Sequence, residues 1–275
     1  MEQVDLAVQQ RQDDAPPAVT LRPLGLADAD DFMAWASDER VMRFLKRPLC
    51  ATREQAVAQI GDTVLGHPWF RAICVAGRPV GQVSVWPYAD EGGHRANLGY
   101  ALAHGLWGRG IAAAAIIQVV ARVFDELPGL ERLEAVTDVE NVRSQRVLEK
   151  AGFRREGVLR SYIVRRSGEV MDAAIYSFLA SDRPAHERER PLFNHSGANF
   201  VSWEIVFGGL PGLERLEAVT DVENVRSQRV LEKAGFRREG VLRSYIVRRS
   251  GEVMDAAIYS FLASDRPAHE RERPL

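Results

Sequence analysis

The chain has few cysteines, little net charge and no long apolar run. Cys50 and Cys74 are too few for a disulfide framework and have no metal-ligand spacing around them, so we expect a reducing compartment and no metal. A formal net charge of −2 gives no electrostatic reason for a nucleic-acid or membrane partner. No apolar run approaches the roughly 20 residues that cross a bilayer. These absences predict a protein of the cytoplasm, or of the cytoplasm and nucleus.

The N-terminal residues are polar and contain no apolar core of a secretory signal. We therefore expect a disordered leader over residues 1–17. The rest of the chain has the composition of a globular protein, with 46% hydrophobic and 27% charged residues in the whole sequence. We divide it into a domain over 18–182, a polar tail and connector over 183–209, and an incomplete repeat over 210–275.

The repeat is the most unusual feature of the sequence, because Leu127–Leu192 recurs without a mismatch as Leu210–Leu275. A solenoid needs at least three units, so a duplication explains the identity better. The second copy lacks the central apolar helix and the glycine loop described below. We expect a redundant, poorly packed fragment that competes for the first copy's place in the sheet or self-associates with a partner chain.

The order of elements predicts an α/β fold with a mixed sheet and helices on both faces. A hairpin is expected around Ser167-Gly168, and a capping box of Thr52 and Gln55 opens one helix. Gly152 follows the last helix, as expected of a helix stop. The expected strands lie at 19–22, 69–75, 80–86, 97–103, 133–137, 161–164 and 170–178, and the expected helices at 28–43, from 52, at 111–124 and at 141–151.

Three glycines, Gly105, Gly108 and Gly110, lie between the strand at 97–103 and the apolar helix at 111–124. Glycines let a backbone approach a phosphate closely, and a helix N-terminus offers unpaired N–H groups with partial positive charge. Arg109 adds a full charge beside them. An ordinary turn is the alternative interpretation, and the pattern is not the dinucleotide-binding fingerprint.

A second motif, Asn141-Val-Arg-Ser144, opens the short helix that ends before Gly152. Asn141, Ser144 and Leu148 share one helix face at i, i+3 and i+7. The Asn141 amide offers both donors and acceptors to an amide-bearing ligand. The alternative is that Asn141 only caps the helix. The second copy repeats the motif at Asn224 and Ser227.

Taken together, these motifs resemble the GNAT acyl-CoA-dependent N-acetyltransferases, over roughly Val19 to Asp182. The closest branch looks like the RimJ/RimL type, the ribosomal-protein-alanine acetyltransferases, including its uncharacterised plant relatives. The residues that carry the resemblance are Trp107-Gly-Arg-Gly-Ile-Ala112, Asn141-x-x-Ser144, Val147-Leu-Glu-Lys-Ala-Gly-Phe153, Leu98-Gly-Tyr100, Trp35-x-Ser-Asp38, and Gly168 followed by Asp172.

The resemblance implies a splayed GNAT-like sheet and acetyl transfer from acetyl-CoA to a primary amine by direct attack on the thioester. Asn141 would contact the pantetheine arm, and Ser144 would lie near the sulfur as an acid for the leaving thiolate. The residues implied for the pyrophosphate are Gly108, Arg109, Gly110, Ile111 and Ala112, and those implied for the pantetheine arm are Ala101, Leu102 and Ala103.

Three positions depart from the family pattern. Gly105 stands where Gln or Arg is frequent, Leu148 where many members have a Tyr acid, and Asn97 where related plant sequences carry Glu. Candidates for the base are therefore sought elsewhere, at Glu134, Asp138 and Tyr162. Strand alternation puts Glu134 and Asp138 on one face, although Asp138 could cap a helix and Glu134 could form a surface ion pair.

The missing base bears on the acceptor. A Lys amine with a pKa of about 10.4 loses its proton at pH 7 at a cost of about 4.6 kcal/mol, whereas an α-amine costs only about 1–1.4 kcal/mol. We therefore expect an α-amine acceptor, a protein N-terminus or a small amine of low basicity. The alternative from another class is a pseudoenzyme that binds CoA or another protein.

Arginines are frequent after the second motif. The alternatives are a solvated basic face and a site for an acidic substrate tail, and the residues concerned are Arg154, Arg155, Arg160, Arg165 and Arg166.

Overall fold

The computed structural model of the chain describes residues 18–45, 47–88, 93–165, 167–183, 214–248 and 251–265. The chain divides into two units, one of Met1–Ser84 and Gly99–Val119, and one of Val85–Leu98 and Val120–Leu275. The leader predicted over 1–17 and nearly all of the predicted connector lie outside the described residues.

In the first unit, β1 (Val19–Arg22), β2 (Phe70–Val75) and β3 (Arg78–Pro87) are antiparallel neighbours in that order. The turn between β2 and β3 has two residues in the left-handed region, Ala76 at φ 48° and Gly77 at φ 79°. Two such residues in succession suit a tight hairpin, because their twist matches that of the flanking strands. The strands expected at 69–75 and 80–86 are confirmed as the two arms of this hairpin.

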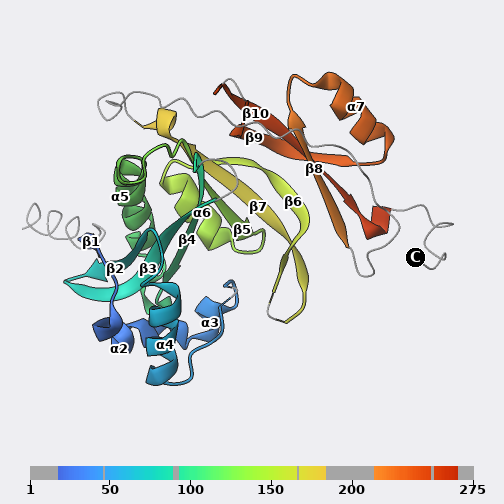
Figure 1. Ribbon diagram of the computed structural model, residues 1–275. Coiled ribbons are helices and arrows are strands. Elements are labelled where there is room, and N and C mark those ends of the chain that lie inside the picture. Colours follow the sequence, from blue (N-terminus) through green and yellow to red (C-terminus); the bar gives the residue numbers. More distant parts are fainter. Residues whose placement is uncertain are drawn as a thin grey trace, which may run out of the picture. The chain divides into compact units, whose positions relative to one another are not determined.

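Among the described residues, four helical segments of the first unit precede β2 in the sequence. They are η1 (Leu26–Asp28), α2 (Ala29–Ala36), α3 (Glu39–Met42) and α4 (Arg53–Thr63), and α2 packs against α4 (Figure 1). Trp35, 1% exposed, lies in the core, where its Nε1 donates to Gln82 Oε1 at 3.2 Å. The helical segment expected over 28–43 is confirmed, and it is divided among η1, α2 and α3.

The capping box predicted for α4 is formed only in part. Thr52 accepts a hydrogen bond from the backbone N–H of Gln55 at 3.4 Å, as a capping residue should. The Gln55 side chain, however, accepts from the N–H of Ala51 at 2.7 Å. The Gln55 side chain therefore accepts from the N–H of Ala51 rather than from the N–H of Thr52, as a capping box would require. This hydrogen bond connects Ala51 to the first turn of α4.

Three elements, β3, β4 and α5, run from one unit into the other. β4 (Arg95–Leu102) is followed by η3 (His104–Leu106), and α5 spans Ile111–Glu126. Most of the apolar side chains of α5 are buried, as expected of an apolar helix, and its exposed positions include Arg122 and Asp125. Ile117 is an exception, since it is 49% exposed.

In the second unit, the first copy forms β5 (Arg132–Asp138), α6 (Val142–Lys150), β6 (Arg154–Val164), β7 (Val170–Leu179) and η4 (Ala180–Asp182). The β4–β5 pair is parallel, whereas β7 is antiparallel to both β5 and β6. The predicted mixed α/β sheet is therefore confirmed.

β6 begins at Arg154, well before the predicted start at Ser161. The reason is a register shift between Leu159 and Ile163, where Ser161 has a φ of 49°. A bulge of this kind breaks the alternation of apolar and polar residues. The alternation therefore marks only the part of the strand that follows the bulge.

The second copy repeats these elements as β8 (Arg215–Asp221), α7 (Val225–Lys233), β9 (Arg237–Val247), β10 (Val253–Leu262) and η6 (Ala263–Asp265). The strand order of the second unit is β4-β5-β7-β6-β9-β10-β8, so the second copy extends the sheet from β6 (Figure 1). Leu231, Ala257 and Tyr259 are at most 1% exposed. The expectation of a poorly packed fragment is wrong, because α7 covers β8 and β9 as α6 covers β5 and β6.

Gly152 supports a stability prediction. It follows the capping residue of α6 with a φ of 89°, and an added Cβ would lie 3.2 Å from Phe178 Cε2. Gly152→Ala should lower the free energy of unfolding by about 1–2 kcal/mol, the cost of a left-handed alanine. Urea denaturation followed by circular dichroism measures the change.

Gly61→Ala is the control, because Gly61 lies within α4 and has open space where a Cβ would be. That variant should be more stable by about 0.5–1 kcal/mol. If Gly152→Ala were as stable as the unmodified chain, the left-handed turn would not constrain this helix end.

Candidate functional site

The glycine loop connects β4 with α5. Gly108 and Gly110 have φ values of 82° and 76°, both in the left-handed region that favours glycine. Trp107 Nε1 donates to the carbonyl of Leu102 at 2.8 Å, which folds the loop back onto the end of β4. The two glycines are therefore required by the path of the chain as it turns into the helix.

This turn has the features of an anion site. The carbonyl of Gly110 accepts from Ala114 N at 2.9 Å, the first bond of a 16-residue helix whose earliest N–H groups have no partner within the helix. Arg109 is exposed, and a Cβ at Gly108 would meet nothing within 4 Å. A phosphate could thus approach the backbone at the positive end of α5, so the residues fit a pyrophosphate.

The strand before the loop is tightly held on one side. The N–H of Ala103 donates to the carbonyl of Val80 at 2.9 Å, and a Cβ at Gly81 would collide with the carbonyl oxygen of Ala101. Ala101 and Leu102 are each 6% exposed. Pairing of β4 with β5 is registered over Arg95–Asn97. The splaying of the sheet beyond Asn97 stays a prediction.

In the second unit, Asn141 caps α6. Its Oδ1 accepts from the backbone N–H of Ser144 at 3.2 Å, so the capping role considered for it is confirmed. The same contact joins Asn224 and Ser227 at 3.1 Å in α7. The local geometry of the motif is therefore set by its own sequence, and both copies have it. Whether Asn141 also contacts a ligand stays a prediction.

Leu148, one of the three departures from the family pattern, has a structural role. Its side chain is fully buried and belongs to the core under α6. A leucine has no proton to give, so the acid that many family members carry at this position is absent here. The position contributes packing instead.

The two candidate carboxylates on β5 are both held by arginines. Glu134 accepts from Arg132 Nε at 3.0 Å and lies 3.8 Å from Arg95, and its side chain is 6% exposed. Asp138 accepts from the N–H of Glu140 at 2.8 Å and pairs with Arg165 at 2.6 Å. Asp138 therefore orders the turn before α6, whereas Glu134 forms a buried rather than a surface ion pair.

Two neighbours of Glu134 were missed in the sequence. The guanidinium of Arg95 lies 5.1 Å from the ring centre of Tyr88, and burial together with the nearby Glu134 carboxylate raises the pKa of that phenol. The only signal in the sequence is that Arg95 and Asn97 alternate along one strand, on the same face. Neither Tyr88 nor Arg95 belongs to a motif identified in the sequence.

Tyr162 lies on β6 beside the second copy. Burial and then the carboxylates of Glu217 and Glu134 raise its pKa, so the phenol keeps its proton at neutral pH. It is thus suited to donate a proton rather than to accept one. Whether Tyr162 acts on a substrate stays a prediction.

The basic face expected after α6 is only partly solvated. Arg154 has a side chain that is 66% exposed, but that of Arg165 is 12% exposed and pairs with three carboxylates. Arg160 contacts the second copy. These arginines organise the protein's own carboxylates, while Arg166 lies outside the described residues.

Neither a metal centre nor a membrane span is found in the described part of the chain. It contains no group of three or more His, Cys, Asp or Glu residues that could hold a metal ion. None of its helices is both long enough and apolar enough to cross a bilayer.

Comparisons with known proteins agree with this fold. A family model described as the GNAT acetyltransferase domain matches residues 18–154. The uncharacterised N-acetyltransferase YoaA of Bacillus subtilis is 30% identical over 165 residues, which are 58% of this chain and 92% of YoaA.

Solved structures give the same result. An acetyltransferase from T. thermophilus is 34% identical, with a TM-score of 0.51 over 60% of this chain and 87% of that protein. RimJ of Mycobacterium smegmatis, solved with CoA-disulfide, is 25% identical, with a TM-score of 0.52 over 62% of this chain and 88% of RimJ. The family model matches residues 18–154, and the chain covers 92% of YoaA at 30% identity. This chain therefore belongs to the GNAT family of acetyltransferases.

Proposed function

We propose that the chain transfers the acetyl group of acetyl-CoA to a primary amine, and that the glycine loop binds the pyrophosphate. The observation that carries the proposal is the left-handed turn of Gly108 and Gly110 at the start of α5. The charge of Arg109 would add to the N–H groups of Ile111 and Ala112 in neutralising the phosphates. The chain is an acyltransferase by family, so the pseudoenzyme alternative has no support.

The rest of the cofactor is assigned by resemblance to the family. The pantetheine arm would pair with the backbone of Ala101, Leu102 and Ala103, and the Asn141 amide would contact the same arm. The helix cap already uses Asn141 Oδ1, so its amide N–H groups are the donors that we assign to the ligand. A RimJ/RimL-like branch is part of this proposal, supported by the likeness to RimJ.

The reaction needs two proton movements. The neutral amine attacks the thioester carbonyl, the new C–N bond forms, the C–S bond breaks, and the leaving thiolate takes a proton. We assign that donation to Ser144, with Tyr162 as a second protonated group. The ammonium formed by attack loses its proton, for which Glu134 is our candidate. Its two arginines would hold the carboxylate in place.

The acceptor we propose is an α-amine, of a protein N-terminus or a peptide. Asn97 and Leu148 stand at positions where family members carry a base or an acid, and neither side chain can remove a proton from the amine. Glu134 is therefore the base that we propose. An α-amine is deprotonated at pH 7 at a cost about 3 kcal/mol lower than that of a lysine. We also propose a cytoplasmic or nuclear location, because Cys50 and Cys74 are both free and buried.

The acceptor is tested with two peptides, one with a free N-terminus and no lysine, and one with a blocked N-terminus and a single lysine. We expect release of CoA thiol to be roughly 10-fold or more faster with the first at pH 7, because more of its amine is neutral. The lysine peptide should gain on it as the pH rises toward 10. Faster lysine acetylation at pH 7 would contradict the α-amine proposal, and no release from either peptide would contradict the activity.

Arg109→Ala tests the pyrophosphate site. Losing one charge-assisted contact of about 1.5–3 kcal/mol should raise the KM for acetyl-CoA roughly 10-fold or more. The kcat should change little, because the phosphates are bound equally in the ground state and the transition state. Arg122→Ala, which removes an exposed arginine of α5 outside the loop, is the control. Equal KM values for the two variants would remove Arg109 from the site.

The duplication supplies a matched control for Ser144. Ser144→Ala and Glu134→Gln should each lower kcat, by about 10²-fold for a proton-transfer group. Ser227→Ala, which makes the same change in the second copy, should leave kcat unaltered. Steady-state kinetics across a pH series, with unfolding curves to monitor stability, make the comparison. A Glu134→Gln variant whose pH–rate profile is unchanged would show that Glu134 is not the base.

A further inference from the structure

β6 and β9 have identical sequences and pair with each other in antiparallel register at Gly157 and Gly240. A Cβ on Gly157 would collide with the carbonyl oxygen of Glu239, and a Cβ on Gly240 with that of Glu156. Each glycine therefore lets the other strand's backbone approach. Gly157 and Gly240 occupy equivalent positions in the two copies, so each copy makes the same contact with the other.

The polar contacts from the second copy to the first follow one pattern. Arg243, at the equivalent of position 160, donates from its backbone N–H to Glu156 at 2.9 Å. Its guanidinium contacts Ser177 Oγ at 2.6 Å and Asp182 at 3.0 Å. The Glu156 side chain is 3% exposed, and the same carboxylate also pairs with Arg132 of the first copy at 2.7 Å.

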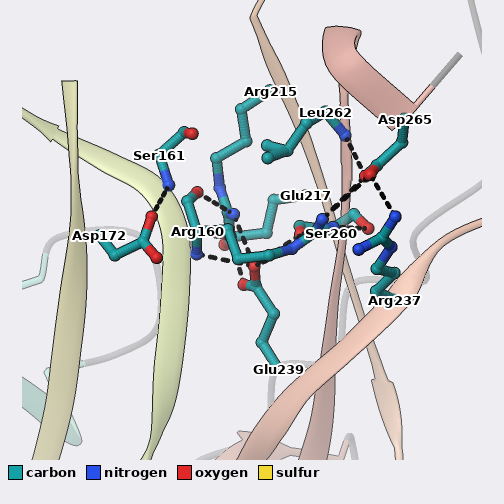
Figure 2. Close-up of polar contacts among 10 residues, drawn as sticks. All are labelled: Arg160, Ser161, Asp172, Arg215, Glu217, Arg237, Glu239, Ser260, Leu262 and Asp265. Atoms are coloured by element: carbon teal, nitrogen blue, oxygen red, sulfur yellow. Dashed lines mark hydrogen bonds and ion pairs between the residues drawn. The ribbon is translucent and has the colours of Figure 1, made fainter.

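The contacts from the first copy to the second repeat this pattern (Figure 2). The N–H of Arg160 donates to Glu239 at 2.8 Å, and its guanidinium contacts Ser260 Oγ at 2.7 Å and Asp265 at 2.9 Å. Glu239, Ser260 and Asp265 are the equivalents of Glu156, Ser177 and Asp182. If residue i of one copy contacts residue j of the other, the reverse contact is therefore also made, which defines an isologous interface.

The junction also has an apolar core to which the copies contribute equally. Its buried residues are three from the first copy and their three equivalents from the second, namely Leu159, Ala173 and Ile175 with Leu242, Ala256 and Ile258. None of the six is more than 4% exposed. Without the second copy, β6 would be an edge strand with unpaired backbone groups beside an apolar surface.

We propose that the β6 edge is a self-association surface whose fitted partner is a second copy of this segment, and that β9 occupies it within the same chain. An isologous contact between identical sequences is the contact that a twofold dimer makes. Here both halves are on one chain, so the second copy is present at a high effective concentration. The full chain should then be a monomer because its dimer surface is already covered.

Gly240→Val in the full chain tests the proposal. Valine favours strands, but its side chain would collide with the carbonyl of Glu156, so β9 should leave β6. β6 keeps Gly157 and can pair with β6 of another molecule. Light scattering after size exclusion should give the mass of one chain for the unmodified protein and of two chains for the variant.

The double variant Gly157→Val/Gly240→Val is the matched control. It also releases β9 but blocks the β6 edge, so it should be a monomer. Circular dichroism spectra and urea unfolding curves of all three proteins show whether the first copy remains folded. A monomeric Gly240→Val protein, a dimer that persists in the double variant, or a dimeric unmodified chain would each overturn the proposal.

Discussion

The second unit depends on one buried cation, the guanidinium of Arg132. The side chain is fully buried, and it donates to Glu134 on its own strand, to Glu156 on β6 and to the carbonyl of Arg243 on β9. A charge removed from water is tolerated only where its donors are satisfied, because desolvation otherwise costs several kcal/mol. The burial of Arg132 on β5 therefore depends on the Glu156 carboxylate of β6. It also depends on the carbonyl of Arg243, which the second copy supplies.

Much of the fold could be predicted from the sequence, because local rules set it. Apolar periodicity located the strands and α5, and Gly152 marked the end of α6, where the observed φ requires a glycine. The failures have tertiary causes. The bulge at Ser161 interrupts the alternation of β6, so the sequence pattern did not predict its first half. The Gln55 side chain accepts from the N–H of Ala51, a donor that the capping-box spacing does not specify. The second copy was expected to pack poorly, since its partner on β6 cannot be read from its own pattern.

The candidate site could be predicted where it consists of backbone and only in part where it consists of side chains. Glycines between a strand and a helix indicate a phosphate turn, and Gly108 and Gly110 do adopt the left-handed conformation. The surroundings of Glu134 depend on Arg95, which is distant in sequence and belongs to no motif. Long-range ion pairs follow strand register, and register is fixed by the whole sheet.

Identical sequences here have unequal surroundings, and this separates what a motif does alone from what its neighbours add. Asn141 and Asn224 cap their helices alike, so the cap belongs to the motif. Glu134 and Glu217 differ, with side chains 6% and 36% exposed, because β4 pairs with β5 in the first copy whereas β8 ends the strand order of its unit. The burial of Glu134 is thus conferred by β4, the strand that leads to the glycine loop. The glycine loop and β4 both precede the duplicated residues, so only Glu134 of the first copy is buried by β4. Duplicating the helix and hairpin therefore cannot create a second enzyme site.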